Sequence, residues 1–127
     1  MREEARQWFD RAEQDLDDAV YAVDGGREKL AAFLFQQFCE KALKASLIEK
    51  NGSHPRTHNL VRLGKELDTP SEYDELFEDL TPIYTGCPYP DGATTPPQDI
   101  EDTARRIKAF RAWMKHRLTE ETAISDV

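Results

Sequence analysis

Cysteine and long apolar runs are scarce in this sequence. The 127 residues include two cysteines, Cys39 and Cys87, which fit no CxxC or other metal-ligand spacing. This pattern argues against a disulfide and against a cysteine-based zinc site, and it favours Cys39 as a small buried core residue. The longest apolar stretches are a few residues, far short of the roughly 20 that span a bilayer. We therefore expect no membrane segment and a cytoplasmic protein.

Positive charge is also in short supply. The chain has 17 Lys and Arg residues and 25 acidic residues, which leaves a formal net charge of −8. Such an acidic chain repels phosphate backbones, so a general DNA-coating role is disfavoured. With 127 residues, of which 39% are hydrophobic, the chain has the size of one domain with one core. We predict a single domain over residues 1–127, with its core in residues 3–118 and a frayed tail over 119–127.

Apolar residues recur at helical spacing along most of the chain, and strand-like alternation is absent over any useful length. This spacing predicts helices over residues 3–23, 28–50 and 60–67, a further helix opened by the capping box Thr69–Glu72, and a last helix that ends near Leu118. Glycines follow the first two helices and are typical of helix ends. The predicted fold class is all-α, an up-and-down bundle of four to five helices.

Two regions depart from simple helix patterning. The second helix carries more apolar surface than one neighbour would cover, because Phe35, Phe38 and Cys39 widen its stripe. We predict that it is the central helix, with part of its surface left for a partner chain. Residues 83–97 contain four prolines and two glycines, which predicts a long loop. Within that loop, Thr95–Gln98 repeats the capping-box pattern ahead of the last helix.

A specific motif begins inside the second helix. It is Gln36-Gln37, then Glu40-Lys41-Ala42-Leu43-Lys44, and it is followed by Thr57-His58-Asn59-Leu60. Further matching positions are Trp8, Ala12, Asp15-Leu16 and Ala19 in the first helix, and Tyr84 with Tyr89-Pro90-Asp91 in the long loop. In this combination the chain resembles the HEPN-domain family over residues 3–118.

The resemblance implies a bundle of about five helices that is often a homodimer. Such domains are frequently paired with a small nucleotidyltransferase-like protein in two-component modules, many of them toxin–antitoxin pairs. Some members are thought to bind nucleotides, and others are metal-independent RNases. We predict no metal site and no cofactor. In this chain Pro88 occupies the position where the family usually has an arginine before the Tyr-Pro-Asp motif.

Arg111 and His116 are the candidate catalytic residues. The RNase members place an arginine and then a histidine, four to six residues later, on the final helix, and these two residues have that spacing. The arginine would stabilise a pentavalent phosphate while the histidine exchanges the 2′-hydroxyl proton, provided that two pairs meet across a dimer. Ala112 stands where those enzymes usually carry a polar residue. The pair is also typical of a basic helix end that complements the helix dipole.

A dense cationic cluster lies between the second and third predicted helices. It consists of His54, Arg56, His58 and Arg62, and it leads into a helix start, where backbone donors favour anions. A phosphate group would fit there. The alternative is that His58 or Asn59 caps the short helix while the two arginines are merely solvated.

Further candidate ligand contacts come from the second helix and the long loop. Lys41 and Lys44 would reach toward the cationic cluster, although Glu40 and Lys44 also have the spacing of an intrahelical ion pair. Gln37 follows Gln36 in an apolar run, so at least one of the two is expected to be buried and hydrogen-bonded.

Three residues of the long loop complete the candidate ligand set. Tyr84, Tyr89 and Asp91 would stack on and hydrogen-bond a base, or would instead hold the loop against the bundle.

The leading hypothesis is a homodimeric module that binds a nucleotide and pairs with a nucleotidyltransferase-like protein. The competing hypotheses are a metal-independent RNase toxin with Arg111 and His116 at its site, and a non-catalytic scaffold subunit that binds a basic partner. The ligand is a nucleotide in the first hypothesis and RNA in the second, and neither hypothesis involves a membrane.

Overall fold

The computed structural model describes residues 1–83 and 99–125, and it describes 120–125 by their backbone alone. Its helices are α1 (Glu3–Asp24), α2 (Glu28–Asn51), α3 (Leu60–Leu67), α4 (Asp74–Leu80) and α5 (Ile100–Ser125), with single 3-10 turns η1 (Ser71–Tyr73) and η2 (Thr81–Ile83) on either side of α4. The described residues contain no strand. The predicted all-α class is therefore confirmed.

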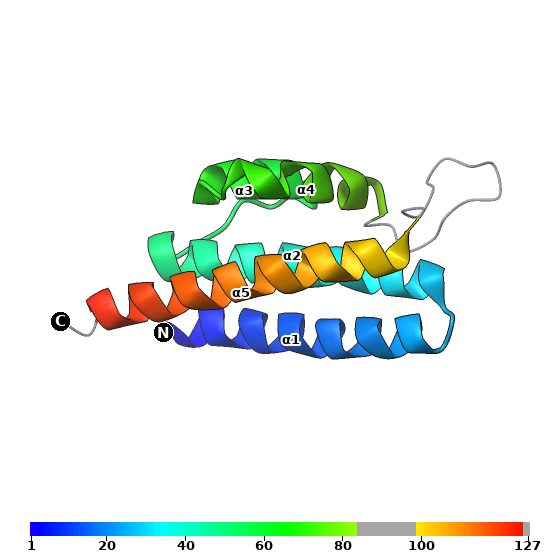
Figure 1. Ribbon diagram of the computed structural model, residues 1–127. Helices are drawn as coiled ribbons and strands as arrows, with labels where there is room; N and C mark the ends of the chain where they lie inside the picture. The colour runs from blue at the N-terminus through cyan, green and yellow to red at the C-terminus, as the bar shows by residue number, and fades with distance from the viewer. Residues whose placement is uncertain (84–98, 126–127) are drawn as a thin grey trace.

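Three long helices form the body of the molecule (Figure 1). Helices α1 and α2 make an antiparallel hairpin, and α5 lies alongside them with the same direction as α2. The short helices α3 and α4 form a second layer on the other side of α2 and α5 from α1. This arrangement confirms the predicted up-and-down bundle, and α2 is its central helix because it contacts each of the other four.

Small residues allow α1 and α2 to pack closely. Ala5, Ala12 and Ala19 of α1 are fully buried at a spacing of seven residues, which keeps them on one face of the helix. The hairpin turn is closed by Gly26, which has a φ of 74° that glycine adopts without a steric cost. The backbone N–H of Arg27 then donates to the carbonyl oxygen of Ala22 at 2.8 Å. These features fix the register of the hairpin.

Aromatic rings tie the α3–α4 layer to the long helices. Phe110 of α5 is fully buried and meets Phe38, Tyr73 and Phe77 edge to face, with ring centroids 5.3 to 6.1 Å apart. Edge-to-face pairs at such distances add to the stabilisation that burial already provides. Cys39, next to Phe38, is fully buried as the sequence predicted, and burial raises the pKa of its thiol far above the ordinary range.

Three helix ends differ from the sequence-based prediction. Thr69 does not cap the following helix, because its hydroxyl donates to the carbonyl oxygen of Gly64 and so closes α3 instead. The α4 helix begins only at Asp74. The last helix begins at Ile100, where the Asp99 carboxylate accepts from the backbone N–H of Asp102, and it continues to Ser125 instead of ending near Leu118. Residues 95–98 lie outside the described residues.

The chain itself covers most of the wide apolar surface of α2. Phe35, Phe38 and Cys39 are fully buried by the other helices. Among the residues that the structure describes, the large apolar side chain of α2 that remains exposed is Leu30, in the first turn of the helix. None of the helices within residues 1–83 and 99–125 is long and apolar enough to cross a membrane.

The Gly64→Ala substitution is expected to destabilise the fold, although alanine favours helices more than glycine does. A Cβ atom at this position would lie 2.8 Å from Thr69 Oγ1 and 2.9 Å from Phe77 Cε2, and the Phe77 ring is locked in the core. We expect the free energy of unfolding to fall by about 1 to 3 kcal/mol, as in other overpacked cores. Urea denaturation measures it.

The matched control is Gly25→Ala, where a Cβ atom would lie 3.5 Å from its closest neighbour, the Tyr21 carbonyl oxygen. The backbone φ at Gly25 is −86°, which alanine adopts without strain. This variant should match the wild type in stability. If Gly64→Ala were as stable as the wild type, the prediction would be contradicted, because α3 and α4 would then accommodate the added methyl group without a loss of stability.

Candidate polar site on the central helix

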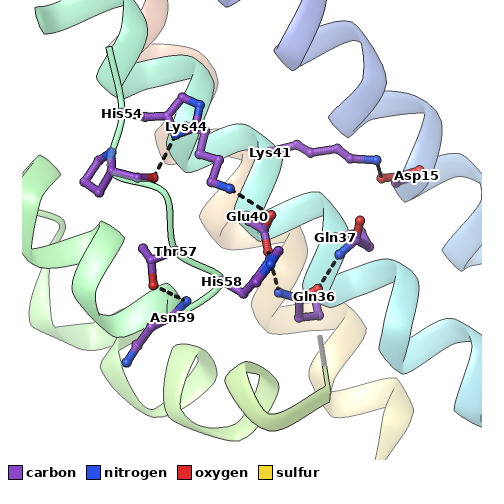
Figure 2. A network of polar contacts seen from close by, with 11 residues as sticks. Asp15, Gln36, Gln37, Glu40, Lys41, Lys44, His54, Thr57, His58 and Asn59 are labelled. Carbon is purple, nitrogen blue, oxygen red and sulfur yellow. Dashed lines mark hydrogen bonds and ion pairs between the residues drawn. The ribbon is translucent and has the colours of Figure 1, made fainter. Parts of the chain in front are cut away.

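A buried carboxylate organises the polar site of this protein (Figure 2). Glu40 lies in the middle of α2 with a side chain that is 7% exposed. Gln36 Nε2 and His58 Nδ1 donate to Glu40 Oε1 at 3.1 and 2.9 Å, and Lys44 Nζ donates to Oε2 at 3.0 Å. Three donors therefore satisfy a charge that would be costly to bury alone.

Helical spacing brings two of these donors to Glu40. Gln36 and Lys44 lie four residues before and after it, which places all three on one face of α2. The intrahelical ion pair of Glu40 and Lys44 that the sequence suggested is confirmed. Gln36 is fully buried, and its Oε1 accepts from Gln37 Nε2 at 2.7 Å. The prediction that one of the two glutamines is buried and hydrogen-bonded is therefore confirmed.

The third donor, His58, comes from the loop that precedes α3. Asn59 fixes that loop, because its side-chain oxygen accepts from the backbone N–H of Arg62 and caps α3. Thr57 Oγ1 accepts from the Asn59 N–H, and Thr81 Oγ1 accepts from the Leu60 N–H. Of the two caps that the sequence left open, Asn59 is the one used. His58 instead turns its ring toward α2, with 57% of its side chain exposed.

The balance of burial and hydrogen bonding sets the ionisation of Glu40. Burial raises its pKa, but the hydrogen bonds from His58, Gln36 and Lys44 and the charge of Lys44 outweigh burial, so the pKa lies below its ordinary value. An ionised carboxylate only accepts hydrogen bonds, so the hydrogen of the His58 contact resides on Nδ1. Glu40 therefore fixes both the position and the tautomer of the His58 ring.

Lys44 also connects the site to α1. Its Nζ lies 5.6 Å from the centroid of the half-buried Trp8 ring, a cation–π geometry. Trp8 also meets His54 edge to face, with ring centroids 5.2 Å apart. His54 Nδ1 in turn donates to the Pro55 carbonyl oxygen at 2.8 Å. These contacts hold the first part of the loop against the α1–α2 hairpin.

Lys41 points away from the cationic loop. Its Nζ contacts Asp15 Oδ2 of α1 at 2.6 Å, and both side chains are partly exposed. Lys44 is buried and committed to Glu40. Neither lysine thus extends the cationic surface in the way that the sequence suggested. This pairing has no signal in the local sequence pattern, because Asp15 lies 26 residues from Lys41.

Two arginines make the exposed part of the cluster. Arg56 and Arg62 are exposed, and within the described part of the chain neither side chain has a hydrogen bond or an ion pair. They lie in the same loop and helix start as His54 and His58. The predicted cluster of two histidines and two arginines is therefore present on one short segment, whereas Tyr84, Tyr89 and Asp91 lie outside the described residues.

The two candidate RNase residues, Arg111 and His116, do not form a pair of neighbouring side chains within one copy of the chain. Arg111 makes a bidentate ion pair with Glu13 of α1, at 2.8 and 2.7 Å, and hydrogen bonding to Glu13 raises its pKa. His116 is exposed on α5. Residues five apart on an α-helix point about 140° away from each other, so the two side chains of one copy lie on different faces.

The donor set for a metal ion is limited. Within residues 1–83 and 99–125 there is no group of three or more His, Cys, Asp or Glu side chains that would hold a metal ion. The polar site itself offers cations, an oriented imidazole and amide groups, which suit an anionic ligand with hydrogen-bonding edges.

Comparisons with known proteins agree with the resemblance predicted from the sequence. The sequence model of the HEPN domain family matches residues 5–117. The crystal structure of an archaeal HEPN homologue superposes with a TM-score of 0.73 and 28% sequence identity, covering 92% of this chain and 98% of that one. A search of curated proteins found no match.

Replacing Glu40 with glutamine should lower the free energy of unfolding at neutral pH. It should also remove the part of the pH dependence of stability that comes from the titration of Glu40. The variant leaves Lys44 buried without a counter-charge, which is expected to lower the free energy of unfolding at pH 7 by about 3 kcal/mol. Because the pKa of Glu40 is lowered on folding, ionised Glu40 stabilises the wild type at neutral pH. That contribution begins to fall below the ordinary glutamate pKa of about 4.3, and it is lost as the pH passes through the lower folded-state pKa.

Urea denaturation of wild type and Glu40→Gln between pH 7 and pH 3 measures this difference. The two stabilities should converge as the medium becomes acidic. Glu78→Gln is the matched control, because Glu78 is exposed on α4 and should leave both stability and pH dependence unchanged. A constant gap between Glu40→Gln and wild type over the whole pH range would contradict the assigned ionisation.

Proposed function

Because this chain belongs to the HEPN domain family, we propose that it is a helical module that binds a nucleotide and works as a homodimer. In this proposal residues 1–127 act as one domain in the cytoplasm, together with a separately encoded nucleotidyltransferase-like protein. The two proteins would form a two-component system of the toxin–antitoxin kind. An adjacent reading frame with the glycine-serine and paired-aspartate motifs of nucleotidyltransferases would support this pairing.

One observation carries the proposal of nucleotide binding. In a chain with a net charge of −8, two histidines and two arginines gather between His54 and Arg62, and the arginines are exposed without an ion pair among the described residues. Because the chain as a whole is acidic, a segment that gathers two exposed arginines and two histidines is favoured as the place where a phosphate group binds. Arginine is well suited to that role because its planar guanidinium binds phosphate oxygens in pairs.

The buried network supports the same proposal. Glu40 holds the His58 ring at the edge of the cationic segment, and the hydrogen bonds from His58, Gln36 and Lys44, together with the Lys44 charge, keep Glu40 ionised. We propose that Arg56, His58 and Arg62 contact phosphate groups, while Lys44 acts only through Glu40. Gln37 is half-buried beside Gln36 and would hydrogen-bond the ligand.

The remaining ligand contacts in the proposal follow from the family resemblance. Tyr84, Tyr89 and Asp91 would contact the base. Lys41 would join them only after leaving Asp15, to which its ammonium group is bound at 2.6 Å.

The geometry of Arg111 argues against the RNase alternative. Its Nε and one Nη donate to the two oxygens of Glu13, so a phosphate group that binds this edge of the guanidinium would have to displace a bidentate carboxylate. In the proposed module, Arg111 joins α5 to α1 and has a structural role.

Nucleotide binding is tested by calorimetric titration of the wild type with ATP, GTP and their diphosphates. The double variant Arg56→Ala/Arg62→Ala should bind the best of these at least about tenfold more weakly, a loss of roughly 1.4 kcal/mol. The control Arg6→Ala/Lys108→Ala removes two exposed cations elsewhere and should keep the wild-type affinity. No binding of any nucleotide would refute the function, and equal affinity of the double variant would refute this site.

An RNase assay separates the two main hypotheses. Wild-type protein incubated with mixed RNA in excess EDTA is expected to leave the RNA intact. Arg111→Ala/His116→Ala serves as the comparison, once its helical content is shown to be unchanged. Cleavage by the wild type that is lost in this variant would replace the binding module with a metal-independent RNase.

A further inference from the structure

His58 joins a buried carboxylate to the surface of the protein. Its Nδ1 donates to Glu40 Oε1 at 2.9 Å, and 57% of the His58 side chain is exposed, against 7% of the Glu40 side chain. Figure 2 shows the ring reaching from the loop before α3 to the middle of α2. In an imidazole whose Nδ1 carries the hydrogen, Nε2 carries the lone pair. The carboxylate therefore holds the ring with Nε2 as its nucleophilic nitrogen.

The charge of Glu40 is balanced by a cation of its own helix. Lys44 Nζ donates to Glu40 Oε2 at 3.0 Å, and the side chains of both residues are 7% exposed. Because this ion pair has no net charge, Glu40 orients the His58 ring without repelling an anion at the surface. The same carboxylate would stabilise a positive charge that develops on the ring.

Exposed cations stand on both sides of His58 in the chain. Arg56 lies two residues before it and Arg62 four residues after it, and neither has an ion pair among the described residues. Two extended residues span at most about 7 Å, so a group bound at the imidazole is within reach of Arg56. The backbone of this stretch is fixed, since Asn59 caps α3 and its N–H donates to Thr57 Oγ1. Guanidinium groups bind phosphate oxygens in pairs.

We propose that His58 is a phosphoryl acceptor, whose Nε2 attacks the terminal phosphoryl group of a nucleoside triphosphate and forms phosphohistidine. This inference rests on the proposed function for its donor, because the nucleotide is the ligand of the same segment. The terminal phosphoryl group carries the most charge and the fewest substituents of the three, which suits a site with two exposed guanidinium groups. Histidine is one of the side chains that form covalent intermediates in enzymes.

The bonds and protons of this transfer balance. The lone pair of His58 Nε2 forms a bond to the γ-phosphorus. The bond from that phosphorus to the bridging oxygen breaks, and its electron pair leaves on the nucleoside diphosphate. The hydrogen on Nδ1 stays in its hydrogen bond to Glu40, which offsets the positive charge gained by the ring. Arg56 and Arg62 would stabilise the charge on the phosphoryl oxygens during the transfer.

His54 provides a comparison within the same segment. It lies four residues before His58, but its Nδ1 contacts the carbonyl oxygen of Pro55 at 2.8 Å, and its ring packs against Trp8. A carbonyl oxygen carries no full charge that would offset a positive ring. The two histidines share the neighbouring arginines, so a difference in their reactivity reports the effect of the carboxylate.

Phosphorylation by phosphoramidate tests the acceptor without a nucleotide. This small donor passes its phosphoryl group to an imidazole nitrogen and releases ammonia. His58 should be labelled at least about tenfold faster than His54, because Glu40 stabilises the charged product. The label should be on Nε2, since Nδ1 is bound to Glu40. Peptide mass spectrometry locates the label and phosphorus NMR identifies the nitrogen, and both use the wild-type protein, so neither depends on the folding of a variant.

Nucleoside triphosphates with a radioactive γ- or α-phosphate test the donor. The nucleotide that binds best by calorimetry should transfer the γ-label to the protein, as a product that is stable in alkali and lost in acid. His58→Gln should abolish this labelling, and Arg56→Ala/Arg62→Ala should slow it at least about tenfold. Arg6→Ala/Lys108→Ala removes two exposed cations elsewhere and should be labelled at the wild-type rate. Circular dichroism checks that each variant keeps its helical content.

The outcomes separate this inference from the proposed function. A nucleotide that binds but leaves no γ-label on His58 would overturn the phosphoryl acceptor and leave nucleotide binding intact. Label from the α-phosphate, or equal reaction of His54 and His58 with phosphoramidate, would also overturn it. A protein that binds no nucleotide, yet takes the phosphoryl group of phosphoramidate on Nε2 of His58 in preference to His54, would contradict the proposed function and support the acceptor.

Discussion

The buried carboxylate of Glu40 is the interaction on which the polar half of this structure depends. It lies on a central helix that is almost wholly buried from Phe35 to Glu49, so its charge is stable there only with the three donors that surround it. Those donors come from two places in the sequence, α2 itself and the loop before α3. Satisfying one charge thus fixes where the loop runs and which ring it presents.

The fold could be predicted from the sequence to a large extent because its helices depend on local patterns. Apolar spacing predicted α1, α2 and α3 to within one residue at each end. The prediction that Thr69 caps the following helix was wrong because of tertiary packing. Phe77 packs against Gly64, and Thr69 lies beside Gly64 at the end of α3, where its hydroxyl donates to the Gly64 carbonyl oxygen. Sequence spacing alone does not distinguish a hydroxyl that opens one helix from one that closes the helix before it.

The polar site was predictable in its members but not in its pairings. The sequence indicated that at least one of Gln36 and Gln37 is buried and hydrogen-bonded, and that Glu40 and Lys44 have the spacing of an intrahelical ion pair. Two pairings could not be predicted from the sequence. They are His58 with Glu40, which are 18 residues apart, and Arg111 with Glu13, which are 98 residues apart. Such pairings depend on how loops and distant helices pack. The second one changes the interpretation of Arg111, from an available catalytic cation to one already committed to a carboxylate.

The use of charge along the chain explains which of the candidate cations remain available to a ligand. Acidic side chains pair with Lys41, Lys44 and Arg111, whereas Arg56 and Arg62 are exposed and have no ion pair among the described residues. The segment that carries these two arginines meets α2 at Glu40, where His58 donates to the same carboxylate that binds Lys44. The buried network therefore holds the segment in place, while the guanidinium groups on its surface are not consumed by that network.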